Sequence, residues 1–166
     1  DTLPSNVQGY GMPNMGAMFD DTPKYVLDQD VTFDNSGETW TWIGSTVDPS
    51  KPVRIVLAFT DAPGAIGTSP QVNDLNLAAD VAGATYLGNV FSGQWSVTGG
   101  AADPFNNYEA IFLPAGTDGA IEITVTGFNI AGDGVPNAGD ETDQDFALVC
   151  YNCAQTPTYS LNVTPA

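Results

Sequence analysis

Apolar and polar residues alternate along several stretches of this chain. In residues 38–43 both tryptophans fall on one side of an extended backbone and the threonines fall on the other. In residues 120–128, Ile121, Ile123 and Val125 share one face, while the opposite face is polar. A period of two residues is typical of a β-strand that buries one face, so both stretches are predicted to be strands.

Other strand candidates are short and are separated by Gly, Pro, Asn and Asp turns. Residues 53–60 have apolar side chains at every second position and a partly apolar second face, which indicates a central strand. Residues 75–79 and 84–87 are predicted to form a hairpin around Gly83. The remaining candidates are residues 25–27, 31–33, 108–113, 146–151 and 159–163.

These segments predict an all-β protein, because no convincing amphipathic helix accompanies them. The expected fold is an antiparallel β-sandwich or jelly roll of about eight to nine strands. Residues 1–22 show little periodicity and are expected to form an irregular lead-in, followed by a β-sandwich domain of residues 23–166.

The charge of the chain argues against two classes of partner. There are 20 Asp and Glu residues against 3 Lys and Arg residues, which gives a formal net charge of −17 at pH 7. Nucleic acid is disfavoured, because phosphate contacts need clustered cations and this chain has only Lys24, Lys51 and Arg54. Anionic membranes are disfavoured for the same reason, and no apolar run approaches the roughly 20 residues of a membrane-spanning helix.

The sequence contains no histidine. A Ser-His-Asp or Cys-His arrangement, or a histidine metal site, therefore cannot be built within this chain. What remains for so acidic a chain is carboxylate chemistry, binding of hard cations, or no catalysis.

The two cysteines, Cys150 and Cys153, form a single C-x-x-C motif. A structural zinc site needs more ligands than one such motif supplies. A redox dithiol normally opens a helix in a βαβ unit, whereas this motif ends a strand-like run. A small local disulfide and two free thiols are the simpler interpretations.

Five carboxylates gather in the glycine-containing loop of residues 132–145. Like charges at this density repel one another unless a cation or water screens them. Calcium takes six to eight oxygen ligands, so Asp133, Asp140 and Asp143 are candidate calcium ligands. The spacing differs from that of an EF-hand loop, and a solvated acidic loop is the alternative.

Acids and amides also stand at the ends of predicted strands that are far apart in the sequence. Such side chains can converge on one edge of a sandwich and surround a hard cation. Alternatively, they satisfy backbone groups in turns, as Asx-turns do. The residues are Asp61, Asn73, Asp74, Asn107 and Glu109.

Aromatic residues could form a platform on which sugars or peptides stack, although most large aromatics in a sandwich of this size belong to the core. Asp143 and Asp145 could serve as the paired carboxylates of a glycosidase, but the sequence indicates no cleft around them. The aromatic candidates are Trp40, Trp42, Tyr86, Trp95, Tyr108, Tyr151 and Tyr159.

Several segments resemble subtilisin-like serine proteases (subtilases). Residues 8–15 (QGYGMPNM) resemble the segment that ends the catalytic domain of these enzymes. Five later segments resemble, in order, the C-terminal β-sandwich domain of secreted bacterial subtilases, a jelly roll loosely similar to the P-domain of proprotein convertases. They are residues 53–64 (VRIVLAFTDAPG), 72–77 (VNDLNL), 86–91 (YLGNVF), 106–109 (NNYE) and 143–151 (DQDFALVCY).

The resemblance covers most of the chain from about Tyr25 to Tyr151 and implies a non-catalytic accessory domain of a secreted, extracellular protease. Residues 1–22 would then be the tail of the preceding catalytic domain or a linker. Such domains stabilise the catalytic domain, often bind calcium, and sometimes help to bind a protein substrate. The implied partners are the catalytic domain of the same protease and a protein substrate, with the chain itself a monomer. The catalytic motifs of subtilases are absent here, and the cysteine pair departs from the family pattern.

The resemblance and the residue pattern indicate the same strand-end acids, Asp61, Asp74 and Glu109. We therefore expect calcium there, with Asn73 or Asn107 assisting, and rank the acidic loop that contains Asp133, Asp140 and Asp143 second. A free-standing carbohydrate-binding or adhesion module is the alternative function. Exposed tryptophans in a groove would favour that alternative, and buried tryptophans would favour the accessory domain.

Overall fold

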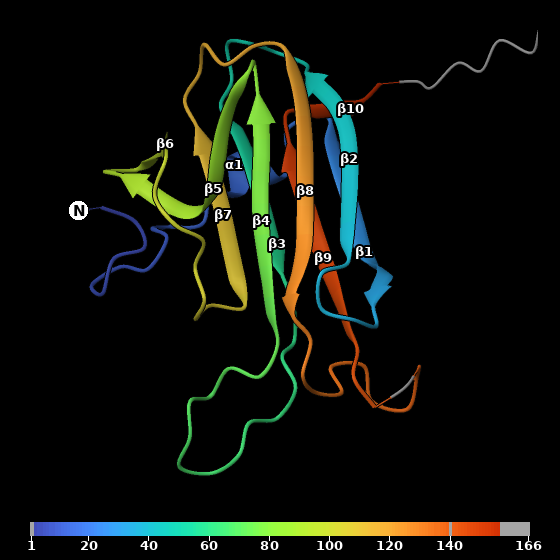
Figure 1. The fold of residues 1–166 in the computed structure, drawn as a ribbon. Helices are drawn as coiled ribbons and strands as arrows, with labels where there is room; N and C mark the ends of the chain where they lie inside the picture. The colour runs from blue at the N-terminus through green and yellow to red at the C-terminus, as the bar shows by residue number, and fades with distance from the viewer. Residues whose placement is uncertain (1, 140, 157–166) are drawn as a thin grey trace, which may run out of the picture.

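The computed structural model describes residues 2–139 and 141–156, which form two antiparallel β-sheets packed as a sandwich (Figure 1). Within these residues there is one short helix, α1 (Met15–Met18), and no helix is long and apolar enough to cross a membrane. The ten strands are β1 (Lys24–Phe33), β2 (Thr39–Thr46), β3 (Val53–Ala58), β4 (Asp74–Val81), β5 (Ala84–Ser92), β6 (Trp95–Thr98), β7 (Tyr108–Leu113), β8 (Ala120–Asn129), β9 (Gln144–Tyr151) and β10 (Cys153–Gln155).

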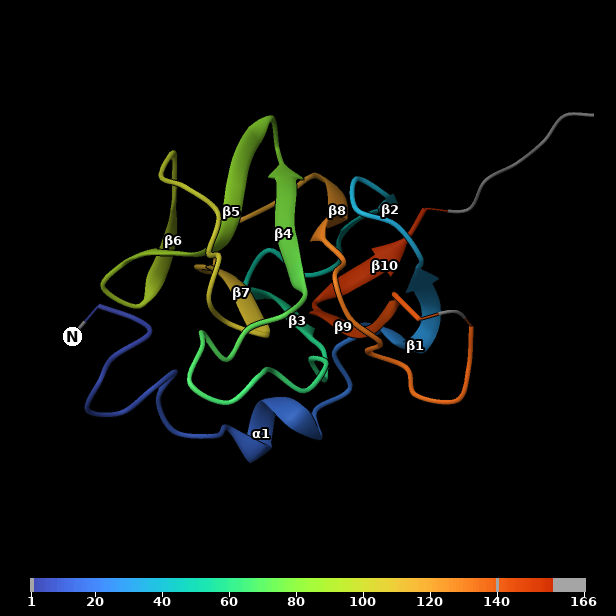
Figure 2. The same ribbon diagram turned by 60° about the horizontal axis from the view of Figure 1, so that its bottom comes forward.

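The strand order confirms the predicted fold class. One sheet has the order β1-β9-β3-β7, and the other has the order β10-β2-β8-β4-β5-β6. Most successive strands alternate between the two sheets, as the two Greek keys of a jelly roll require. Strands β6 and β10 are short additions at the edges of the six-stranded sheet (Figures 1 and 2).

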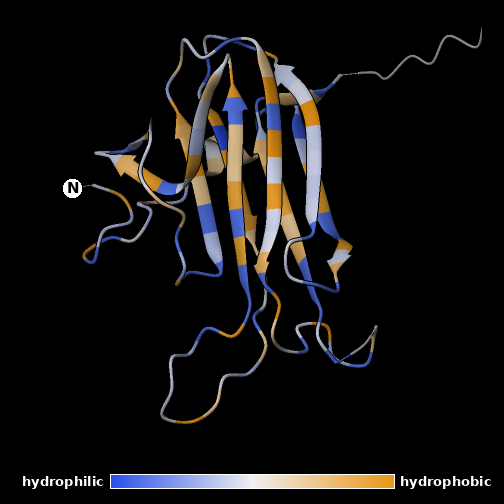
Figure 3. Ribbon diagram, in the orientation of Figure 1, coloured by the Kyte–Doolittle hydropathy of each residue, from blue (hydrophilic) through white to orange (hydrophobic). Residues whose placement is uncertain are grey.

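Alternating side chains from the two sheets fill the space between them. In β3, the side chains of Val53, Ile55 and Leu57 are fully buried, and hydrophobic and hydrophilic positions alternate along the strands in Figure 3. Each such side chain contributes about 1.5–3 kcal/mol on burial, so the periodicity noted in the sequence also supplies the main stabilising term. As predicted, β3 is a central strand, because it pairs with both β9 and β7.

Several local features differ from the sequence predictions or refine them. Strand β1 is one strand where two short ones were expected, and its pairing with β9 is interrupted between Asp28 and Thr32, where Gln29 has a φ of 59°. The β4–β5 hairpin is confirmed; its turn residues Ala82 and Gly83 both have positive φ, the geometry of a type I′ turn. The predicted strand at 159–163 lies outside the described residues.

The two tryptophans of β2 belong to the core. Trp42 is only 2 % exposed, and Trp40 packs against the same hydrophobic cluster. The ring of Tyr25 lies 4.8 Å from that of Trp42. These side chains therefore do not form a surface platform. The third tryptophan, Trp95, is half-buried, and Tyr159 lies outside the described residues.

The segment before β1 packs against the outer face of the four-stranded sheet (Figure 2). The Leu3 amide donates to the Gly93 carbonyl at 2.9 Å, and the Tyr10 hydroxyl donates to Asn89 Oδ1 at 2.7 Å. Apart from α1 the segment is irregular, as expected, yet it has defined contacts with the sandwich.

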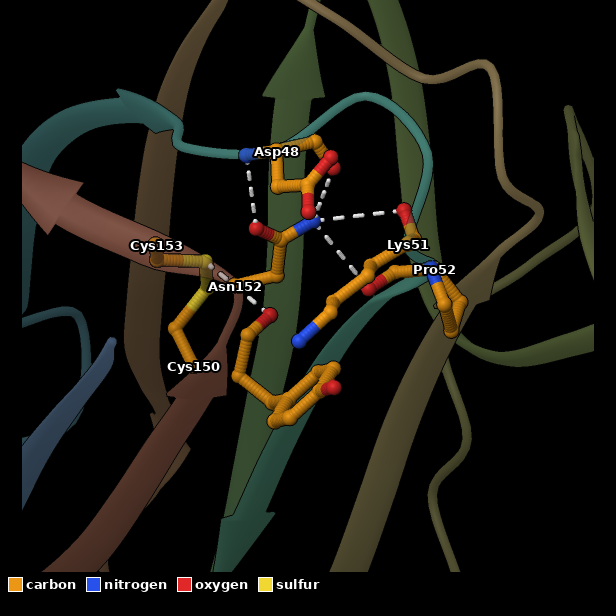
Figure 4. Close-up of a disulfide and its surroundings, with 7 residues drawn as sticks. Asp48, Lys51, Pro52, Cys150, Asn152 and Cys153 are labelled. Carbon is orange, nitrogen blue, oxygen red and sulfur yellow. Dashed lines mark hydrogen bonds between the residues drawn. A yellow bond between two sulfur atoms is a disulfide. The ribbon is translucent and has the colours of Figure 1, made fainter. Parts of the chain in front are cut away.

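The C-x-x-C motif forms a disulfide between Cys150 in β9 and Cys153 in β10. Both residues are buried, and the intervening Asn152 has a φ of 66°. The Asn152 side-chain amide donates to the carbonyls of Asp48 and Lys51, which fixes the loop between β2 and β3 (Figure 4). Of the two simpler interpretations of the sequence, the local disulfide is the correct one.

Candidate metal sites at one end of the sandwich

Two acid-bearing loops lie at the same end of the sandwich, at the bottom of Figure 1. One connects β3 to β4 and the other connects β8 to β9, while the segment that leads into β7 ends nearby. The antiparallel arrangement explains this, because β3 and β8 end where β4, β7 and β9 begin. The expectation that separate strand ends converge is therefore met.

Four of the five strand-end candidates line one hollow of about 260 Å³, which we call the strand-end hollow. They are Asp61, Asn73, Asp74 and Asn107. Glu109, the fifth candidate, is not among the lining residues.

The Asp61 carboxylate is already used by the backbone. Its two oxygens accept hydrogen bonds from the Val72 and Asn73 amides, each at 2.8 Å. This closes the base of the loop between β3 and β4, as the turn alternative anticipated. The Asn107 side-chain amide likewise donates to the Phe59 carbonyl at 2.9 Å.

Asn73 is 2 % exposed and has no capacity left for a metal ion. Its Oδ1 accepts from the Ala131 and Gly132 amides at 2.8 and 2.9 Å, which uses both lone pairs. Its Nδ2 donates to the Gly132 and Asp143 carbonyls and to Gln144 Oε1. Asn73 therefore joins the strand-end hollow to the neighbouring β8–β9 loop.

Asp74 is the acid of the hollow whose carboxylate makes no hydrogen bond with the described residues. Burial raises the pKa of this carboxyl group, and the nearby negative charges of Asp103 and Asp61 raise it further. A cation bound in the hollow would lower the pKa of Asp74. Because both oxygens of Asp61 already accept backbone hydrogen bonds, Asp74 would be the main charged ligand of such a cation.

Glu109 points into the interior of the sandwich, in phase with Ile111 and Leu113 on β7. Its Oε2 accepts from the Leu77 amide at 2.7 Å, whereas Oε1 has no partner among the described residues. Burial raises the pKa of Glu109 to about 8, although the Leu77 hydrogen bond partly opposes the shift. At Gly88 an added Cβ would lie 2.0 Å from Oε2, so a glycine is needed there. Glu109 thus does not line the strand-end hollow, although the negative charges of Asp103 and Asp74 also raise its pKa.

The β8–β9 loop brings Asp133 and Asp143 side by side. The two residues form an isolated parallel β-bridge, and the Gly134 amide donates to the Asp143 carbonyl at 2.9 Å. Asp143 is fully buried, with Oδ1 accepting from the Val135 amide at 3.0 Å. Its Oδ2 is buried with no partner among the described residues, and so is Oδ1 of Asp133.

A glycine also makes room beside this pair of carboxylates. At Gly139, which has a φ of 69°, an added Cβ would lie 2.6 Å from Asp143 Oδ2. We call Asp133, Asp143 and the surrounding backbone of residues 132–139 the loop site. Asp140, the third predicted ligand, lies outside the described residues. Asp145, the other acid considered for catalysis, accepts a hydrogen bond from Gln29 on β1.

The donor atoms of the loop site suit a hard cation. Buried carboxylate oxygens without hydrogen bonds are costly unless a positive charge compensates them, and calcium accepts such oxygens together with backbone carbonyls. Within residues 2–139 and 141–156, however, no three Asp, Glu or Cys side chains group closely enough to hold a metal ion. The loop site therefore offers two carboxylates from these residues.

A second hollow, larger than the strand-end hollow, was not predicted from the sequence. A groove of about 1,040 Å³ lies between the N-terminal segment and the outer face of the four-stranded sheet, and Arg54 lines it. The only indication of this groove in the sequence was Arg54, a cation at a polar position of the predicted central strand. The opposite wall of the groove comes from the irregular N-terminal segment, whose position no periodicity predicts.

Comparison with known proteins adds no assignment: no family model matches the chain, and a search of curated proteins finds no match either.

Proposed function

We propose that this chain is a non-catalytic accessory domain of a secreted subtilisin-like protease, stabilised by calcium at the loop site. The resemblance of residues 53–64 and 72–77 to subtilase C-terminal domains motivates the proposal, and the jelly-roll fold agrees with it. The absence of histidine from the sequence supports a non-catalytic role.

The observation that carries the calcium proposal is the pair of buried, unpartnered oxygens on Asp133 and Asp143. The strand-end hollow, which the sequence ranked first, is the weaker candidate, because the backbone already occupies both oxygens of Asp61. A bound calcium ion would supply the positive charge that the two loop carboxylates lack. Asp133 and Asp143 would hold it, and the Val135 amide orients the Asp143 carboxylate.

The stabilising role follows from where the loop site lies. It connects β8 of the six-stranded sheet to β9 of the four-stranded sheet, so a cation there would fix the two sheets relative to each other. The proposed partners are the catalytic domain of the same protease and a protein substrate, and the proposed state of the chain is a monomer.

Calcium binding is tested by thermal unfolding of metal-free protein with and without added calcium. At free calcium of about 100 times the Kd, the free energy of unfolding should rise by about 2.7 kcal/mol, which raises the melting temperature by several degrees. Magnesium at the same concentration is the control, since it demands a stricter octahedral geometry. Identical melting curves with and without calcium would overturn the calcium proposal.

The accessory role is tested separately. The coding sequence upstream of this chain should contain a Gly-Thr-Ser-x-Ala motif, the serine motif of subtilases. In the whole protease, deletion of the sandwich should shorten the half-life of activity at raised temperature. An upstream sequence without protease motifs would refute this role, whatever the result of the calcium experiment. The carbohydrate-binding alternative is less favoured, because Trp42 is buried in the core and the partly buried Trp40 packs against it.

A further inference from the structure

The groove beside Arg54 has walls of two kinds. One wall is the outer face of the four-stranded sheet, which contributes Val26, Arg54 and Phe112. The other is the N-terminal segment, which contributes Tyr10 and Met12. The volume of about 1,040 Å³ is at the upper end of the range for small-molecule sites, so it has room for several residues of a peptide.

Arg54 is the single arginine of the chain, and its charge is not neutralised. Its guanidinium lies 4.7 Å from the centre of the Trp95 ring and 4.2 Å from that of Phe112. Within the described residues it has neither a carboxylate partner within 4.0 Å nor a hydrogen bond. Burial lowers its pKa, although the group stays charged at neutral pH. The aromatic rings therefore hold the guanidinium in place while leaving its N–H donors free.

The other two cations differ from Arg54 in this respect. Lys24 and Lys51 both pair with Asp20, with N–O distances of 3.4 and 3.1 Å. Because the chain has 20 acids and 3 cations, an unpaired positive charge is rare on its surface. The groove around Arg54 is thus a place where this acidic protein can attract an anionic group, and a guanidinium suits a carboxylate in particular.

We propose that the groove binds an extended peptide segment in which a Glu or Asp side chain pairs with Arg54. Apolar side chains beside that acid would contact Val26, Met12 and Tyr10. The side-chain amides of Gln8 and Gln94 also line the groove, and they make no hydrogen bond with the described residues. They are available to the peptide backbone, which favours a peptide over a small carboxylate ion.

This inference deepens the substrate-binding part of the proposed function, and it rests on that proposal only for the origin of the peptide. Binding itself is a property of the chain in hand. It can therefore fail or succeed independently of the calcium and protease experiments.

The test uses two capped pentapeptides, one with a glutamate between leucines and one with glutamine in its place. Arg54 gives the only arginine Nε–H signal in an NMR spectrum of the protein, so no assignment is needed. The glutamate peptide should shift this signal and the Trp95 indole signal in a saturable way, and the glutamine peptide should bind at least tenfold more weakly. Sodium acetate tests whether a free carboxylate is enough, and it should produce no saturable shift at the same concentrations.

A variant series checks the role of the guanidinium by calorimetric titration. Arg54→Met should weaken binding of the glutamate peptide roughly tenfold or more, and Arg54→Lys should give an intermediate affinity. Lys51→Met is the matched control and should bind as the parent protein does, because the Lys51 charge is paired with Asp20. Equal affinity for the two peptides, or no shift of the arginine signal at millimolar peptide, would overturn the proposal. Neither result depends on whether the variants fold.

Discussion

The strand-end hollow and the loop site lie at the same end of the sandwich and contain the same types of residue, yet Asp61 in the hollow differs in its surroundings from Asp133 and Asp143 in the loop site. In the hollow, both oxygens of Asp61 accept backbone N–H groups. In the loop site, one oxygen each of Asp133 and Asp143 is buried with no partner among the described residues. The two regions touch through Asn73, which lines the hollow and bonds to the loop.

An acidic sequence pattern therefore does not decide whether its carboxylates hold a turn or bind a metal ion. A carboxylate that meets two amides is a structural element of its turn, and a metal ion would have to displace those bonds. A carboxylate that is buried without enough amides needs a cation or a proton. The number of backbone N–H groups around an acid decides between these roles, and that number depends on the path of the loop.

The largest effect is expected at Asn73, which couples the two regions. Asn73→Ala leaves the Ala131 and Gly132 amides without their acceptor, so we expect a loss of about 4 kcal/mol in the free energy of unfolding. Chemical denaturation measures it. Asn129→Ala is the control, because the exposed Asn129 makes a single hydrogen bond to the Val72 carbonyl and should cost less than about 1 kcal/mol. Equal losses would show that the two regions are not coupled through Asn73.

A pH titration examines Glu109, the acid that belongs to neither region. Its pKa of about 8 in the folded protein exceeds the ordinary value of 4.5, so the folded state binds the proton more tightly than the unfolded state. The contribution of Glu109 to the free energy of unfolding should therefore be highest below pH 4.5 and should fall as the pH rises towards 8. Between pH 5 and 7.5 the loss should be about 3 kcal/mol. Glu109→Gln should remove this slope, and an unchanged slope in the variant would assign it to other groups.

Calcium distinguishes the two regions directly. Asp143→Asn should abolish the stabilisation of about 2.7 kcal/mol expected at saturating calcium, whereas Asp61→Asn should retain it. The measurement is the difference in melting temperature with and without calcium for each variant. If the effect of calcium disappeared in Asp61→Asn and persisted in Asp143→Asn, the strand-end hollow would be the site, as the sequence ranking had it.

The smallest effect concerns Asp61 in the absence of metal. Asp61→Asn retains one acceptor oxygen but places an amide group against the second backbone N–H, so it should cost about 1–2 kcal/mol. Asp118→Asn, in the exposed segment between β7 and β8, is the control and should change stability by less than about 0.5 kcal/mol. No difference between the two variants would remove the structural role assigned to Asp61.

The strands could be predicted because burial on one face imposes a period of two, as in residues 120–128. The break at Gln29 could not, since its positive φ depends on the pairing of β1 with β9. Strands β6 and β10 are too short to show a period. For the site, convergence of the strand ends was predictable from the antiparallel order. The position of Glu109 was also within reach, because it falls in phase with Ile111 and Leu113.

The disulfide near β10 has a mechanical consequence. Cys150 belongs to the four-stranded sheet and Cys153 to the six-stranded sheet, so a covalent link joins the two layers at the end of the molecule opposite the acidic loops. Sliding of one layer over the other is restrained at that end by a bond that thermal motion does not break. At the acidic end the layers are joined by chain segments without a disulfide, among them the β3–β4 and β8–β9 loops, so we expect separation of the two layers to begin there.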